Sequence, residues 1–120
     1  MAEHNDLGIK GEQIAAEYLK SRGVEILERN YRYNHKEIDI IAQDRNFLVF
    51  VEVKSRSSNI VTDIEEIIDE QKQKFLIEAA DNYLKTNNVD LEARFDIIIV
   101  RFYITNHVIK HIKNAFYPTL

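Results

Sequence analysis

The sequence contains no cysteine among its 120 residues, which excludes disulfide bonds and thiolate metal sites. A chain without cysteine suits the reducing cytoplasm, where disulfide bonds are rare. Residues 1–13 are polar. They lack the basic segment followed by an apolar segment that marks a secretory signal. We therefore expect a cytoplasmic protein.

Long hydrophobic runs are also missing, because charged residues interrupt every apolar run within about ten residues, well short of the roughly twenty that span a bilayer. We expect no membrane partner. Positive charge is in deficit too, with 16 Lys and Arg against 20 Asp and Glu, for a formal net charge of −4. Coating DNA without regard to sequence depends on many cations. The balance therefore disfavours a DNA coat protein and leaves room for an enzyme with a small basic groove.

The rest of the composition is that of one ordinary globular domain. Hydrophobic residues make up 45% and charged residues 30% of the chain, as in typical soluble domains. A chain of this length can bury a core of its own. No internal repeat, linker or low-complexity segment interrupts it, so we expect a single domain over residues 1–120.

Hydrophobic periodicity predicts one helix, three strands, a long helix and one or two further strands. Residues 7–22 carry an apolar stripe that ends before Gly23, which is typical of a helix and its C-cap. Thr62 and Glu65 match a capping box, which predicts a long helix from there to Lys85. Expected strands lie at residues 24–33, in two runs within 37–54, at 94–100 and, as an edge strand, at 103–112. This order indicates an α/β domain with a mixed sheet and at least one crossover helix.

Residues 37–54, with the sequence EIDIIAQDRNFLVFVEVK, are the most informative segment. They contain two alternating runs separated by the polar turn signal Asp44-Arg45-Asn46. Side chains of a strand alternate between two faces. In the second run one face holds Phe47, Val49, Val51 and Val53, and the other holds Leu48, Phe50, Glu52 and Lys54.

The loop length decides which residues of these two strands face each other. If Arg45 and Asn46 form a two-residue hairpin loop, Asp39 lies across from Glu52, with Cβ atoms roughly 4.5–5.5 Å apart. A three-residue loop would break this pairing. Two carboxylates this close repel each other, and a divalent cation with oxygen ligands is the usual solution.

A simpler reading of the same pattern is a solvated strand edge. Glu52 and Lys54 would then be ordinary surface positions, with Glu37 opposite Lys54 as a cross-strand ion pair of well under ~1 kcal/mol. Phe50 shares their face and implies partial burial, which argues against a fully solvated surface.

An ordered set of motifs resembles a known family. Asp39, followed after 12 residues by Glu52-Val53-Lys54, resembles the PD-(D/E)xK nuclease signature. The whole set resembles the YraN-like family of small bacterial proteins, which is similar to archaeal Holliday junction resolvases and is placed in the restriction-endonuclease-like superfamily. The set comprises Gly8-x-x-Gly11-Glu12, Leu19-x-x-x-Gly23, Arg29-Asn30-Tyr31-Arg32, Glu37-Ile38-Asp39, Phe50-Val51-Glu52-Val53-Lys54-x-Arg56, Lys72 and Arg94-Phe95-Asp96.

The resemblance implies a restriction-endonuclease-like mixed β-sheet flanked by helices. It further implies a metal-dependent endonuclease acting on DNA, including branched or single-stranded DNA, as a homodimer. Asp39 and Glu52, with the carbonyl of Val53, would hold Mg²⁺ or Mn²⁺, a Lewis acid that also activates water. Lys54 would orient that water or neutralise developing charge, and Glu12 would approach as a direct or water-mediated ligand. The expected DNA contacts are Arg32, Arg56 and Lys72.

Each assignment has a structural alternative. Glu12 would also serve as a solvated first-turn glutamate that interacts favourably with the helix dipole, and Lys72 as a lysine at the rim of an apolar face. His107 and His111 fit scattered surface histidines better than a metal pair. Two alternatives for the whole chain are a nucleic-acid-binding relative that keeps the fold without catalysis, and a protein-interaction domain that binds metal for stability only.

Overall fold

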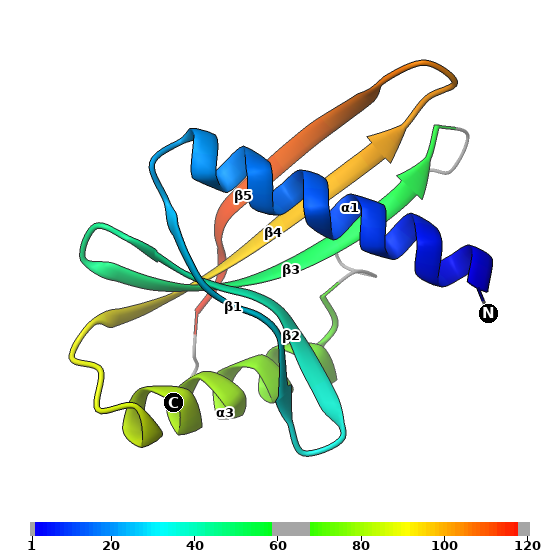
Figure 1. The fold of residues 1–120 in the computed structure, drawn as a ribbon. Coiled ribbons are helices and arrows are strands. Elements are labelled where there is room, and N and C mark those ends of the chain that lie inside the picture. The colour runs from blue at the N-terminus through cyan, green and yellow to red at the C-terminus, as the bar shows by residue number, and fades with distance from the viewer. Residues whose placement is uncertain (1, 59–67, 118–120) are drawn as a thin grey trace.

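Two helices cover opposite faces of a mixed sheet in the computed structural model, which describes residues 2–58 and 68–117, with side chains from residue 6 (Figure 1). The order α1, β1, β2, β3, α3, β4, β5 confirms the α/β class and adds the expected edge strand. The elements are α1 (Ala2–Ser21), β1 (Glu25–Tyr33), β2 (Lys36–Asp44), β3 (Phe47–Ser57), α3 (Glu70–Thr86), β4 (Glu92–Phe102) and β5 (His107–Phe116).

The strands of the sheet lie side by side in chain order, β1-β2-β3-β4-β5. Neighbouring strands are antiparallel except β3 and β4, which are parallel. A parallel pair needs a crossover connection, and α3 lies in the chain between these two strands. None of the helices described is long and apolar enough to cross a membrane.

The alternation predicted for β3 divides the core into two halves, one on each side of the sheet. Leu48 and Phe50 pack in the half beneath α3. Val49 and Val51 pack in the half beneath α1. Both assignments are as expected from period two. Buried α3 residues on the first side are Leu76, Ala79, Ala80 and Tyr83.

The start of α3 differs from the prediction. Asp69 is extended, with φ −72° and ψ 176°, and its carboxylate accepts a hydrogen bond from the backbone N–H of Lys72. An N-cap in this conformation begins a helix, so an unbroken helix from Thr62 to Lys85 is wrong. The proposed capping box at Thr62 and Glu65 lies outside the described residues.

The edge strand β5 also differs from the prediction, since it begins at His107 and runs to Phe116. The segment before it is a turn, closed by a 2.8 Å hydrogen bond from the Tyr103 N–H to the Asn106 carbonyl. The expected strand at residues 103–112 therefore starts too early and ends too soon.

A bend in β2 at Asp39 was not expected. Strict alternation would place Ile38 and Ile41 on opposite faces of the sheet. Both nevertheless pack in the core half beneath α3, while Ile40 packs beneath α1. The neighbouring strand is irregular at the same level, where Asn30 has a positive φ of 54°. The far end of the β1–β2 hairpin consequently curls towards α3 (Figure 1), and Tyr31 meets the ring of Tyr83 there, with centroids 5.1 Å apart.

Candidate metal site

The hairpin between β2 and β3 has the predicted two-residue loop. Asp44 pairs with Phe47, and the same register continues to Ile40 and Val51. Arg45 in the loop has a positive φ of 59°, the left-handed conformation that tight hairpin turns require. The register on which the carboxylate pairing depends is therefore confirmed.

The two strands separate immediately beyond Ile40 and Val51. The backbone N–H of Val53 donates to the Oδ2 atom of Asp39 at 2.8 Å, so a side chain takes the place of a backbone partner. The N–H and C=O of one strand residue point to the same neighbouring strand. The carbonyl of Val53 consequently also faces the gap that holds the Asp39 carboxylate.

Glu52 is a buried carboxylate held by two lysines. Its side chain is 3% exposed, and its Oε2 atom lies 3.2 Å from Nζ of Lys54 and 2.7 Å from Nζ of Lys72. Lys54 is two residues further along β3 and so shares the face of Glu52. Lys72 comes from the first turn of α3. Paired cations compensate a buried charge that would otherwise be costly.

The N-cap of α3 fixes the position of Lys72. The Oδ1 atom of Asp69 accepts the Lys72 backbone N–H at 2.9 Å. The cap thereby sets where the lysine leaves the helix towards Glu52. The sequence signal for this cap is an aspartate directly before Glu70, since aspartate is a preferred N-cap and acidic residues are favourable in the first turn of a helix. The capping-box pattern at Thr62 pointed to an earlier helix start.

The surroundings of Asp39 favour its protonated form. Burial, followed by the charge of Glu52, raises the pKa of Asp39 to about 8. Glu12 raises it further, while the Val53 N–H and the charge of Lys72 act in the opposite direction. Repulsion within the carboxylate pair is as expected from the hairpin register.

The oxygen atoms at this site fit a hard divalent cation. The Oδ1 atom of Asp39 and the Oε1 atom of Glu52 have no hydrogen-bond or ion-pair partner among the described residues. With the Val53 carbonyl they offer three oxygens from two strands. Mg²⁺ commonly binds through one or two carboxylates and keeps several waters. No group of three His, Asp or Glu side chains in the described ranges could hold a metal, so waters would complete the shell.

The other predicted residues make no hydrogen bond or ion pair with Asp39 or Glu52 in the described part of the chain. Glu12 on α1 accepts a 2.8 Å hydrogen bond from Asn30, at the bend of β1. Arg32 pairs with Glu37 at 3.7 Å on the surface. Arg56 donates to the carbonyl of its neighbour Ser55. The structure therefore brings neither arginine onto the carboxylates. The Glu37–Lys54 ion pair of the solvated-edge alternative is not formed, because Glu37 pairs with Arg32 and Lys54 with Glu52.

One polar cluster was missed by the sequence reasoning. Asp96, 1% exposed, receives hydrogen bonds from Arg94 and from His111, whose own side chain is 8% exposed. His111 is thus not a scattered surface histidine. The signal was the spacing Arg94-x-Asp96, which places both side chains on one face of a strand.

Comparison with known proteins supports a single family. Residues 11–100 match the model described as uncharacterised protein family UPF0102. A UPF0102 protein of Bacteroides thetaiotaomicron is 48% identical over 120 residues, covering 100% of this chain and 99% of that protein. Another from Flavobacterium psychrophilum is 45% identical over 117 residues and 98% of each chain. A third, from Chlorobium chlorochromatii, is 43% identical over 118 residues, covering 93% and 92%.

Proposed function

This chain belongs to the uncharacterised protein family UPF0102, the YraN-like family that its motifs resemble, and we propose that it is a divalent-metal-dependent endonuclease hydrolysing DNA phosphodiesters. The family description assigns no activity, so the proposal depends on the site. The main support for the proposal is that Asp39 and Glu52 lie close enough to repel each other where β2 and β3 separate, and that two lysines pair with Glu52.

Asp39 and Glu52 would hold Mg²⁺ or Mn²⁺ together with the Val53 carbonyl. When bound, such a cation polarises a phosphoryl oxygen and lowers the pKa of a water molecule. The raised pKa of Asp39, about 8, favours its protonated form when no cation is bound. Binding must displace that proton, so metal affinity rises with pH.

The two lysines would act on the substrate. An ammonium group has three N–H donors, so Lys54 and Lys72 can each bind Glu52 and still donate to a phosphate or to the attacking water. We assign the water and the developing charge to Lys54, and the phosphate to Lys72. Arg32 and Arg56 would contact phosphates farther along the strand, and Glu12 would act through water.

The proposed substrate is DNA, branched or single-stranded, and the proposed assembly is a homodimer, both from the resemblance to resolvases. With a net charge of −4, phosphate contacts must come from local groups of cations, such as Lys54 and Lys72 beside Glu52. Affinity for DNA should therefore fall steeply with salt, since binding releases condensed counterions.

A second candidate function is nucleic-acid binding without catalysis. It is favoured by the two lysines, which already neutralise Glu52, and by the presence of only two carboxylates in the donor set. Such a site would be stable without a cation and would present the lysines to a phosphate backbone.

Cleavage of a DNA panel separates the two candidates. Linear, single-stranded and branched substrates are incubated with Mg²⁺ or Mn²⁺ and the wild type, Glu52→Gln or Glu92→Gln; the last is a control because Glu92 is exposed on β4. We expect cleavage by wild type and control, and a loss of at least ~100-fold in Glu52→Gln. Binding of DNA by all three proteins with cleavage by none would favour the second candidate.

A further inference from the structure

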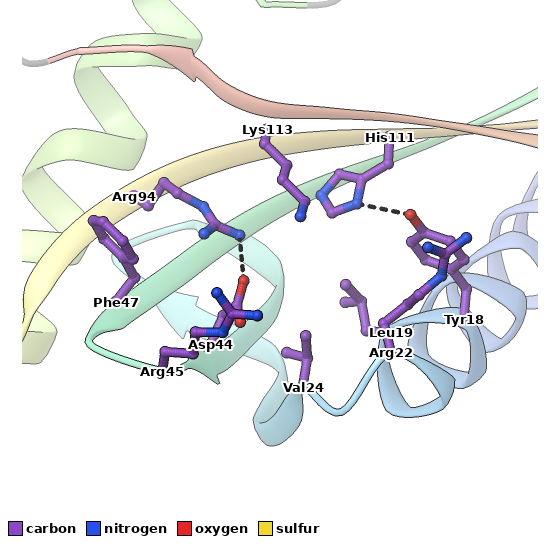
Figure 2. Close-up of a pocket in the computed structure, with 10 residues that line it drawn as sticks. All are labelled: Tyr18, Leu19, Arg22, Val24, Asp44, Arg45, Phe47, Arg94, His111 and Lys113. Carbon is purple, nitrogen blue, oxygen red and sulfur yellow. Dashed lines mark hydrogen bonds and ion pairs between the residues drawn. The ribbon is translucent and has the colours of Figure 1, made fainter.

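A cavity of about 310 Å³ is lined by neither Asp39 nor Glu52, and Figure 2 shows the residues that line it. It is formed by the C-terminal end of α1, the β2–β3 turn and residues of β4 and β5. Phe47 lines it from the α1 side of the sheet, whereas Glu52 faces α3. Phe47 and Glu52 are five positions apart along β3, or about 17 Å at 3.3–3.4 Å per residue. The cavity is therefore distinct from the candidate metal site.

Positive charge collects at this cavity in a chain that is acidic overall. The side chains of Arg22, Arg45, Arg94 and Lys113 line it together (Figure 2). Arg94 is paired with Asp44 at 3.1 Å and with Asp96 at 2.9 Å. The other three have no acidic partner among the described residues. Four cations thus face two carboxylates, and the excess favours a ligand with about two negative charges.

Asp96 anchors two of the residues that line the cavity, Arg94 and His111. Its carboxylate accepts two 2.9 Å hydrogen bonds from Arg94, a 2.8 Å contact from Nε2 of His111 and a 3.0 Å bond from the Asn114 N–H. Burial alone would raise the pKa of Asp96, but the hydrogen bonds from His111, Arg94 and Asn114 hold it below its usual value. The Tyr18 hydroxyl lies 3.0 Å from Nδ1 of His111. These hydrogen bonds fix the guanidinium of Arg94 at the edge of the cavity, so this cation is preorganised for an anion.

An apolar wall lies directly beside the cations. Leu19, Val24 and Phe47 line the cavity, and the guanidinium of Arg94 stacks over the Phe47 ring, 5.3 Å from its centroid. A guanidinium group can donate two parallel hydrogen bonds to two oxygens of one phosphate. The apolar wall can pack against a nonpolar part of the same ligand, such as a ring. The volume is at the lower end of the range for small-molecule sites, about 300–1,000 Å³.

We propose that this cavity binds a phosphomonoester that carries a ring, of which the 5′-phosphate of a nucleotide is the simplest example. A phosphomonoester has a charge of roughly −1.5 to −2 at neutral pH, which matches the excess of cations. An internal phosphodiester has only one negative charge and matches it less well. The phosphate would come either from a free nucleotide or from the 5′-phosphorylated end of a DNA strand.

Calorimetric titration in the presence of a chelator tests the proposal without any contribution from the metal site. The probes are adenosine 5′-monophosphate, adenosine and inorganic phosphate. The test variant is Arg45→Gln with Lys113→Gln, two exposed residues without ion pairs. The control is Lys20→Gln with Lys110→Gln. Both lysines are exposed, on α1 and β5, and lie outside the cavity, so the control removes the same amount of charge as the test variant. We expect the nucleotide to bind more tightly than phosphate, adenosine not to bind, the test variant to lose about tenfold or more, and the control less than about twofold.

Two oligonucleotides identify the source of the phosphate. If a 5′-phosphorylated strand binds more tightly than both the same strand with a 5′-hydroxyl and the mononucleotide, the ligand is a DNA end. If the mononucleotide binds at least as tightly as the phosphorylated strand, the ligand is a free nucleotide. Absence of saturable binding by both the mononucleotide and the phosphorylated strand would overturn the proposal. Equal loss of nucleotide affinity in the test and control variants would also overturn the proposal.

Discussion

The carboxylate of Asp39 accepts the backbone N–H of Val53 at 2.8 Å, so a side chain on β2 completes the hydrogen bonding of β3. This bond positions the carboxylate beside Glu52 at the point where the strands separate. It also joins the fold to the site, because one atom of Asp39 supports the sheet while the other is free to bind a cation.

Substitutions at Asp39 should separate these two roles. Asparagine keeps an oxygen for the Val53 N–H and carries no charge, so it avoids the burial and the repulsion that disfavour the Asp39 carboxylate. Metal-free Asp39→Asn should therefore be as stable as the wild type or more stable. Asp39→Ala leaves the N–H unpaired and should be less stable than Asp39→Asn by about 1–3 kcal/mol. Urea denaturation in chelator measures both; equal stability of the two variants would mean that the hydrogen bond contributes nothing.

The raised pKa of Asp39 predicts how metal-free stability depends on pH. The pKa is about 8 in the folded protein against 3.8 for the ordinary group, so between these values the folded state binds more protons than the unfolded state. The stabilising contribution of the Asp39 proton to the free energy of unfolding is fully present below pH 4. It is lost as pH rises towards 8, at up to about 1.4 kcal/mol per pH unit. The difference in unfolding free energy between wild type and Asp39→Asn, measured from pH 4 to 9, should follow this slope. A difference that is flat with pH would contradict it.

The two glycines of α1 should respond to alanine in opposite directions. A Cβ on Gly8 meets nothing within 4 Å, whereas one on Gly11 would overlap Oγ of Ser55 and lie 3.2 Å from its Cβ. Gly8→Ala should stabilise by about 0.5–1 kcal/mol through helix propensity. Gly11→Ala should destabilise by about 1–3 kcal/mol through overpacking. Thermal unfolding of both variants tests this, and stabilisation by Gly11→Ala would show that β3 yields to the new methyl group.

The N-cap of α3 should contribute to the free energy of unfolding. Asp69→Ala removes the acceptor for the Lys72 N–H and should cost about 1 kcal/mol. Asp90→Ala, at an exposed position in the loop between α3 and β4, is a matched control expected to change stability by less than about 0.5 kcal/mol. If both variants unfold at the same denaturant concentration, the cap does not hold the start of the helix.

The β2–β3 hairpin was predictable because its register follows from local rules. Alternation and a two-residue turn set the faces of β3 and the register with β2, and the structure agrees. The bend at Asp39 was not predictable, since it accompanies the packing of the β1–β2 hairpin on α3, a tertiary contact. The bonds of Asp96 were missed for a similar reason. His111 reaches it from β5, next to an irregularity in the β4–β5 register between Phe95 and Ile97.

The central claim is that Asp39 and Glu52 bind a divalent cation, and thermal melts with Mn²⁺ or chelator test it most directly. The proteins are wild type, Asp39→Asn, Glu52→Gln and the exposed control Glu92→Gln. We predict that wild type and control gain stability with Mn²⁺, by about 2.7 kcal/mol at a concentration 100 times the dissociation constant, and that both site variants gain much less. Equal Mn²⁺ shifts in all four proteins would contradict the claim and remove the main physical support for a nuclease.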